Sequence, residues 1–208
     1  MSDGELRTLA PLTRKGQETR QRIIRAAADL IFEHGVAAFS LDSLRDATGT
    51  SSSQIYHYFS DKGDLVHAVI EYQRDRVLGP HLEAFSALNG WDDFQTWRDM
   101  IVALQAARSC RNGCPLGGLV NGVVESDEVA RELLSDAFSR WGDVIAEGLK
   151  RMIDIGALRA DVDPSELAVG VLASLQGGLL MAEAQRSTRP LEIALDASIS
   201  YLKTFTPI

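Results

Sequence analysis

The side chains with the most evident chemistry lie close together between positions 51 and 62. The stretch 51–58 contains three hydroxyls, one amide, one imidazole and two phenol rings, and Lys62 follows it. An amide such as that of Gln54 can pair with adenine through two hydrogen bonds, and His57 offers a base either a donor or an apolar ring edge. Hydroxyl, phenol and ammonium groups bind phosphate oxygens. The segment therefore has the chemistry of a surface that contacts a nucleic acid.

Two short helices would have to position these side chains. Ser40 fits an N-cap for a helix over 41–47, whose apolar residues recur at helical spacing. A tight turn at Gly49 follows, and a second helix is expected over 52–58. Two short helices joined by a glycine-containing turn predict a helix-turn-helix. At 1.5 Å per residue the second helix is ~10 Å long, which fits end-on into a major groove about 12 Å wide.

The second helix has an apolar and a polar side. Ile55 and Phe59 lie four residues apart and share the face that we expect to pack inward, whereas His57 falls on the outer side. Ser51 and Gln54 also have the spacing of a capping box. Gln54 thus has two interpretations, as a base-reading residue or as a side chain that only closes the helix start.

The stretch 40–65, SLDSLRDATGTSSSQIYHYFSDKGDL, closely resembles the DNA-binding signature of the TetR family of transcriptional regulators. Its most specific part is the run IYHYF at 55–59 with Lys62 at the head of the next helix. The match covers roughly residues 17–70. The chain departs from the family pattern at Thr50, where valine is usual, at 52–53, where Lys-Gly or a similar pair is common, and at Gly63, where glutamate is common.

The resemblance implies an all-α fold with three parts. A flexible arm over 1–15 would precede a three-helix, helix-turn-helix DNA-binding domain over 16–62, and a larger helical domain over 63–208 would bind a ligand and dimerise. Helices are expected over 17–34, from 61 to about 80, over 91–108, 116–124 and 127–155, after 163, and after 190. No segment shows the alternation of a strand.

The resemblance also implies roles for individual residues. Gln54 and His57 would read bases, and Ser51, the two tyrosines and Lys62 would bind phosphates. The complete set of expected DNA-binding residues is Ser51, Ser52, Ser53, Gln54, Tyr56, His57, Tyr58, Lys62 and Arg22, with Arg14 and Lys15 as further backbone contacts. The alternatives are that Tyr56 packs partly in the core and that Lys62 is an ordinary solvated lysine.

Large rings and methionines mark the later helices as walls of a ligand pocket. The residues expected to line it are Trp97, Met100, Leu104, Phe138, Trp141, Leu175, Gln176 and Leu179. Such apolar stripes are also what an ordinary core requires, so packing is the alternative for each position. The mixture of aromatic rings and flexible thioethers suits an apolar or aromatic small molecule, which would act as the effector of a repressor.

The last two expected helices favour a homodimer. Small residues between Ala168 and Gly178 let backbones approach closely, and Leu195 and Ile199 add apolar area, so two helices per subunit would form a four-helix seam. Such a dimer would hold two recognition helices ~34–36 Å apart, which predicts a palindromic operator in double-stranded DNA.

The two cysteines, Cys110 and Cys114, leave three interpretations open. A metal site has little support because no histidine cluster accompanies them, a redox switch would draw on Arg108 and Arg111, and a buried helix start is the third interpretation. The run CPLG at 114–117 is similar to the LmrA/YxaF-like branch of the family.

Charge and composition fit this assignment. The chain of 208 residues carries a formal charge of −8, yet residues 1–62 hold eight basic and eight acidic groups, so the whole excess lies beyond them. The N-terminus has no secretory pattern and no apolar run reaches the ~18 residues of a membrane span, so we expect a cytoplasmic protein without a membrane partner. We expect no cofactor, no metal and no catalysis, since nucleophile and phosphate-loop motifs are missing. The competing hypotheses are a thiol enzyme using Cys114, an interaction protein that has lost DNA binding, and an activator.

Overall fold

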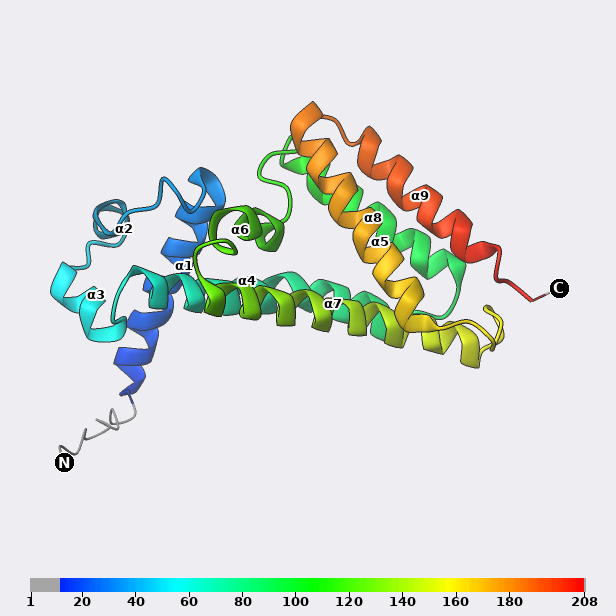
Figure 1. Cartoon of the computed structure of the whole chain (residues 1–208), viewed down its shortest axis with the longest axis horizontal. Coiled ribbons are helices and arrows are strands. Elements are labelled where there is room, and N and C mark those ends of the chain that lie inside the picture. Colours follow the sequence, from blue (N-terminus) through cyan, green and yellow to red (C-terminus); the bar gives the residue numbers. More distant parts are fainter. Residues whose placement is uncertain (1–11, 208) are drawn as a thin grey trace.

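The computed structural model describes residues 12–207, and this part of the chain is entirely helical (Figure 1). Its helices are α1 (Arg14–His34), α2 (Leu41–Thr48), α3 (Ser52–Tyr58), α4 (Lys62–Ser86), α5 (Trp91–Ala107), α6 (Pro115–Val123), α7 (Glu128–Asp154), α8 (Pro164–Gln185) and α9 (Arg189–Lys203). The all-α prediction is confirmed. Of the arm expected over 1–15, residues 1–11 lie outside the described residues.

The first helix begins earlier than its apolar pattern indicated. Thr13 is its N-cap and accepts a hydrogen bond from the backbone N–H of Gly16 at 3.2 Å, so the helix already includes Arg14 and Lys15. At the other end Gly35 has a φ of 80° and a ψ of 160°. The helix therefore ends after His34, as expected, and the glycine that follows is not in the left-handed helical conformation.

The three N-terminal helices share one small core. Ile23 and Ala27 of α1, Leu44 of α2 and Ile55 of α3 are all at most 1% exposed. Gly49, with a φ of 64° and a ψ of 19°, makes the left-handed turn that ends α2 and leads toward α3. This core fixes the direction in which α3 presents its outer side.

The long helix α4 joins this N-terminal unit to the rest of the molecule. It packs on α1 at one end and runs beside α7, while α8 packs on α7 and α9 (Figure 1). Phe85 of α4 meets Phe94 and Trp97 of α5 edge to face, with ring centroids 5.6 and 5.1 Å apart. A displacement of α4 would therefore be felt in both halves of the chain.

α8 corrects one expectation from the sequence. By length and composition alone this helix is apolar enough to cross a membrane. We expected no such run, and the discrepancy arises because Ser174 and Gln176 interrupt a segment whose average is still strongly apolar. Leu167, Val171 and Leu175 of α8 are buried, and the helix packs on α7 and α9. Its apolar character therefore has a structural role within the helical domain.

Candidate nucleic-acid interface and ligand cavity

The start of α3 is held by a reciprocal cap. The backbone N–H of Ser51 donates to Oε1 of Gln54 at 3.1 Å, and the backbone N–H of Gln54 donates to Oγ of Ser51 at 3.2 Å. The side chain of Gln54 is nevertheless exposed. Oε1 of Gln54 also accepts from Oγ of Ser51 at 3.4 Å, so both of its lone pairs are used in the cap and the group left for a base is the Nε2 amide, which only donates. Pairing with both the donor and the acceptor of adenine would require this cap to open.

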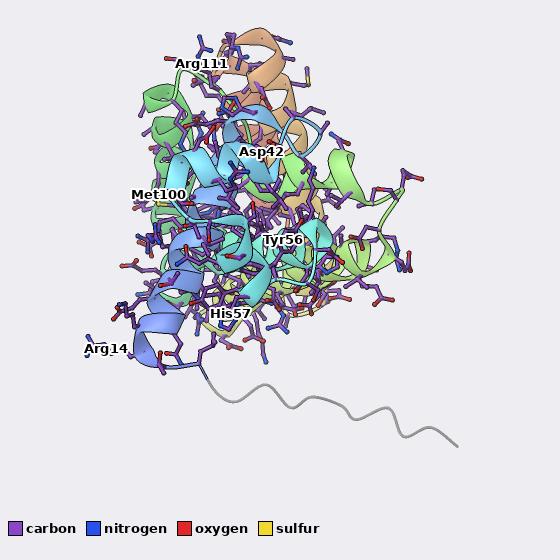
Figure 2. All side chains as sticks on the ribbon, turned by 90° about the vertical axis from the view of Figure 1, so that its left-hand side faces the viewer. Arg14, Asp42, Tyr56, His57, Met100 and Arg111 are labelled. Atoms are coloured by element: carbon purple, nitrogen blue, oxygen red, sulfur yellow. The ribbon has the colours of Figure 1, made fainter. Side chains whose placement is uncertain are left out.

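The outer side of α3 carries the aromatic residues. Ile55 and Phe59 are each 1% exposed, whereas Tyr56 is 55% exposed and His57 is also exposed. Figure 2 shows Tyr56 and His57 together on the face of the N-terminal unit that is turned toward the viewer. The half-buried ring of Tyr58 meets the His57 ring edge to face at 4.9 Å. Tyr56 therefore does not pack in the core, which was the alternative from the sequence.

Two cations expected at phosphates also bind the protein itself. Nζ of Lys62 donates to the carbonyl oxygen of Phe39 at 2.6 Å and lies 5.5 Å from the centre of the Phe39 ring. A guanidinium N–H of Arg22 donates to the carbonyl oxygen of Thr48 at the end of α2. Both side chains remain exposed, so each has further N–H groups for an anion. Their internal bonds tie α1 and α4 to the helix-turn-helix.

The basic segment 14–25 lies on α1, beside the helix-turn-helix. Arg14 is at the start of this helix (Figure 2) and pairs with Glu18 at 3.0 Å, with both side chains largely exposed. Arg20 lies over the Phe59 ring at 5.1 Å. Lys15 and Arg25 are exposed. This surface could add phosphate contacts beside those of α3.

A cavity of about 630 Å³, partly open to solvent, lies between α1, α4, α5, α6, α7 and α8. It is lined by five of the residues expected there, namely Met100, Leu104, Trp141, Leu175 and Leu179. Phe138 and Gln176 instead line two shallower grooves beside α8. Trp97 is buried outside the lining, because its indole N–H donates to Nδ1 of His81 at 2.9 Å.

The polar residues of the cavity were missed by the sequence analysis. His81, Gln73 and Gln105 are buried and line it. The indole N–H of Trp97 can only donate, so Nδ1 of His81 is the acceptor and the proton of the neutral ring is on Nε2. Burial lowers the pKa of His81 to about 4. The available signal was the spacing of Gln73, Val77 and His81, which places two polar residues on an apolar helix face.

Buried polar atoms without partners also lie at these walls. Within the described residues, Oε1 of Gln73, Nε1 of Trp141 and Nε2 of Gln176 have no hydrogen-bond partner, and neither has Oγ1 of Thr50 in the helix-turn-helix. Gln73 and Trp141 both line the cavity. A buried polar group without a partner costs about 1–3 kcal/mol, so each of these atoms lowers stability unless water or another molecule bonds to it.

Both cysteines are buried and unbonded to each other. Burial raises the pKa of the Cys114 thiol, although a hydrogen bond from the backbone N–H of Gly117 acts in the opposite direction. A buried thiol with a raised pKa is a poor nucleophile. Across residues 12–207, no group of three or more His, Cys, Asp or Glu side chains could hold a metal ion. The buried helix start is the interpretation of Cys114 that this geometry supports.

Two family models match the chain. Residues 23–69 match the model of the bacterial regulatory proteins of the tetR family. Residues 91–197 match the model of the C-terminal domain of LmrA/YxaF-like transcriptional regulators. The first match covers the helix-turn-helix, and the second covers α5 to α8 and part of α9.

Individual regulators of this type are also similar to the chain over most of its length. An uncharacterized regulator of the helix-turn-helix type from the lacX 3′ region of Lactococcus lactis is 29% identical over 185 residues, covering 86% of this chain and 91% of that protein. The helix-turn-helix repressor AcnR of Corynebacterium glutamicum is 26% identical, covering 88% and 91%. The crystal structure of a TetR transcriptional regulator from Chloroflexus aurantiacus superposes with a TM-score of 0.79 at 26% identity, covering 91% and 96%.

Proposed function

Because this chain belongs to the TetR family of bacterial regulatory proteins, we propose that it is a repressor that a small effector releases from a palindromic operator. The family consists of transcriptional regulators and not of enzymes, so Cys114 needs no catalytic role. The observation that carries the proposal is the orientation of α3, whose apolar residues are buried while Tyr56 and His57 face outward. We propose the cytoplasm as its location.

On the DNA, α3 would enter the major groove with its N-terminus first. His57 and the amide nitrogen of Gln54 would contact base edges, and Ser51, Ser52, Ser53, Tyr56, Tyr58, Lys62 and Arg22 would contact the backbone. The absence of lysine at position 52 leaves more of the phosphate binding to the basic face of α1. Non-specific affinity should therefore depend on Lys15 and Arg25 as well as on α3.

The homodimer would form through α8 and α9. Large apolar side chains of these helices are exposed in the single chain: Val169, Leu180, Met181, Ile193 and Tyr201, at 51–65%. A Cβ added at Gly170 or Gly177 of α8 would meet nothing within 4 Å, so another helix could approach closely there. Large apolar side chains exposed together on two neighbouring helices favour an interface, and a second copy would cover them.

The effector would occupy the cavity of about 630 Å³. This volume lies within the range of sites for small molecules, and Trp141, Leu104 and Leu175 supply apolar walls. The cavity includes Asp29 and Phe32 of α1, the helix that supports the helix-turn-helix. Ligand binding and DNA binding would thus be coupled through α1 and α4.

The test uses the purified protein and the DNA upstream of its own gene. We expect binding to a palindromic segment with a steep dependence on salt, at a stoichiometry of one dimer per site, and reduced transcription in vitro when the protein is added. A monomer in solution, or binding that does not distinguish this DNA from unrelated DNA, would contradict the proposal. Increased transcription would show an activator instead.

A further inference from the structure

We propose that the cavity binds an amphipathic anion, whose acid group pairs with Arg108 and Arg76 and whose apolar body lies against Trp141 and Leu175. This inference rests on the effector cavity of the proposed function and names the chemical class of its ligand. Arg76 and Arg108 both line the cavity, although the protein as a whole carries a charge of −8. The cavity therefore has two positive side chains in a protein whose net charge is negative.

The two arginines differ in whether a carboxylate of the protein already pairs with them. Arg76 pairs with Asp29 at 3.4 Å, and Asp29 is the acidic residue in the lining. No carboxylate within residues 12–207 lies within ion-pair distance of Arg108, whose guanidinium is 5.5 Å from the centre of the Phe32 ring. With His81 neutral, the lining carries two positive charges and one negative charge. One monoanion would balance it.

The charged state of Arg108 is itself disfavoured by this environment. Burial lowers the pKa of its guanidinium, and the charge of the nearby Arg76 lowers it further. Arginine nevertheless stays protonated in proteins. The lowered pKa therefore does not mean that Arg108 releases a proton; it means that the site has a positive potential that an anion would stabilise. A carboxylate, sulfonate or phenolate between the two arginines would accept hydrogen bonds from both guanidinium groups.

His81 and Trp141 add donors to the lining, because the N–H at Nε2 of His81 and the indole N–H of Trp141, unpartnered within residues 12–207, can only donate. The amides of Gln73 and Gln105 can both donate and accept. Acceptor oxygens on a ligand suit the donors of His81 and the two arginines. Met100, Ile101 and Leu104 supply the apolar wall that an amphipathic body needs and that a small inorganic ion would leave empty.

The same arginines also hold α1. Arg76 reaches Asp29, and Arg108 lies over Phe32, and both of these partners belong to α1. A bound anion would compete with Asp29 for Arg76 and draw Arg108 away from Phe32. Ligand binding and the position of α1 would then be linked, because the ligand and α1 use the same guanidinium groups.

The test uses two fluorescent probes with the same rings. 1-Anilinonaphthalene-8-sulfonate carries an acid group, and N-phenyl-1-naphthylamine is the same molecule without it. Each is titrated into the full-length protein. We expect Arg108→Gln to weaken binding of the sulfonate probe about tenfold, the effect of losing one charge-assisted pair, and to change binding of the neutral probe less than about twofold.

Three further variants complete the experiment. Arg76→Gln should act in the same direction but less, because Asp29 already shares that charge. Arg108→Lys should retain most of the sulfonate binding, and it keeps the test valid if Arg108→Gln fails to fold. Arg140→Gln changes an exposed arginine that pairs with Asp136 and does not line the cavity, so it should change neither probe.

The outcomes separate this inference from the proposed function. Equal losses of affinity for the two probes, or an unchanged affinity for the sulfonate probe in both glutamine variants, would overturn the proposal that the cavity binds an anion. DNA binding of the wild-type protein without probe is measured on the same preparation. A failure there would overturn the proposed repressor, while a selective loss of the sulfonate probe would still support the anion site.

Discussion

The helix-turn-helix and the ligand cavity treat polar groups in opposite ways. Around α3, Ser51 and Gln54 bond to each other within four residues of chain, and Tyr56 and His57 on the outer side face solvent. Around the cavity, Gln73 and Trp141 have buried polar atoms that find no partner in the described part of the chain. In the first region the cap supplies its own hydrogen bonds, and the side chains that we propose to contact DNA are already solvated by water. The second has groups that a ligand would satisfy.

This difference indicates what would give α3 its affinity for DNA and the cavity its affinity for a ligand. DNA binding by α3 depends on a rigid support, because exposed side chains gain precision only from the buried residues behind them. The proposed ligand binding in the cavity would instead draw on polar groups without partners, because the free energy lost in burying them is recovered when a ligand bonds to them. Changes to buried residues should therefore act indirectly in the first region and directly in the second.

The largest effect should come from removing the support of α3. Phe59→Ala deletes a ring that is 1% exposed, and we expect a loss of about 3–5 kcal/mol in the free energy of unfolding together with loss of operator binding. Tyr56→Ala removes a ring from the outer side of the same helix. It should change stability by less than about 0.5 kcal/mol and still weaken DNA binding. Urea unfolding and fluorescence anisotropy check both, and a stable Phe59→Ala would contradict the comparison.

Protonation of His81 should destabilise the cavity region. Its pKa falls from the ordinary 6.5 to about 4 in the folded protein, so the unfolded chain takes up a proton first as the pH falls. The contribution of neutral His81 is fully present above pH 6.5 and is lost progressively between pH 6.5 and about 4, by up to roughly 3 kcal/mol.

The control for this prediction keeps the bond to Trp97. His81→Asn still offers an acceptor to the indole N–H and does not titrate in this range. We expect its free energy of unfolding to depend less on pH than that of the wild-type protein between pH 6.5 and 4. Parallel curves for the two proteins would show that other groups cause the acid sensitivity.

Base reading by α3 should show as a smaller but selective effect. His57→Ala should weaken binding to the operator about tenfold and binding to unrelated DNA much less, since a base contact is worth ~1–3 kcal/mol. Lys62→Ala, at a residue expected to contact phosphate, should weaken both and lower the salt slope by about one unit. Competition with unrelated DNA at two salt concentrations measures this, and equal losses for His57→Ala would place His57 on the backbone.

The same contrast explains what the sequence could predict. The caps at Ser40 and Ser51, the left-handed Gly49 and the buried pair of Ile55 and Phe59 depend on neighbours within a few residues, so periodicity and capping rules predicted the helix-turn-helix closely. The internal bonds of Lys62 to Phe39 and of Arg22 to Thr48 span 23 and 26 residues, and no local rule indicated them.

The cavity was predicted less completely because six helices build it. Helical spacing identified apolar walls such as Trp141 and Leu175, but it could not separate residues that line the space from those behind them. Trp97 was expected in the lining and instead binds His81, a partner 16 residues away. The sequence analysis assigned Arg76 no role and Arg108 only a possible influence on the cysteines, and the packing of α1 against α4 and of the end of α5 brings both to the cavity.

Thr50 is the exception to the comparison and gives the smallest predicted effect. It is 3% exposed, its hydroxyl has no partner among residues 12–207, and it stands where the TetR pattern usually has valine. Thr50→Val replaces the hydroxyl by a methyl of similar size, so it should raise the free energy of unfolding by about 1 kcal/mol and leave operator affinity unchanged. Thr48→Val is the matched control, because Oγ1 of Thr48 donates to the carbonyl oxygen of Leu44 at 2.7 Å. That change should instead destabilise by roughly 0.5–1.5 kcal/mol, and a destabilised Thr50→Val would mean that its hydroxyl has a partner, such as water, in solution.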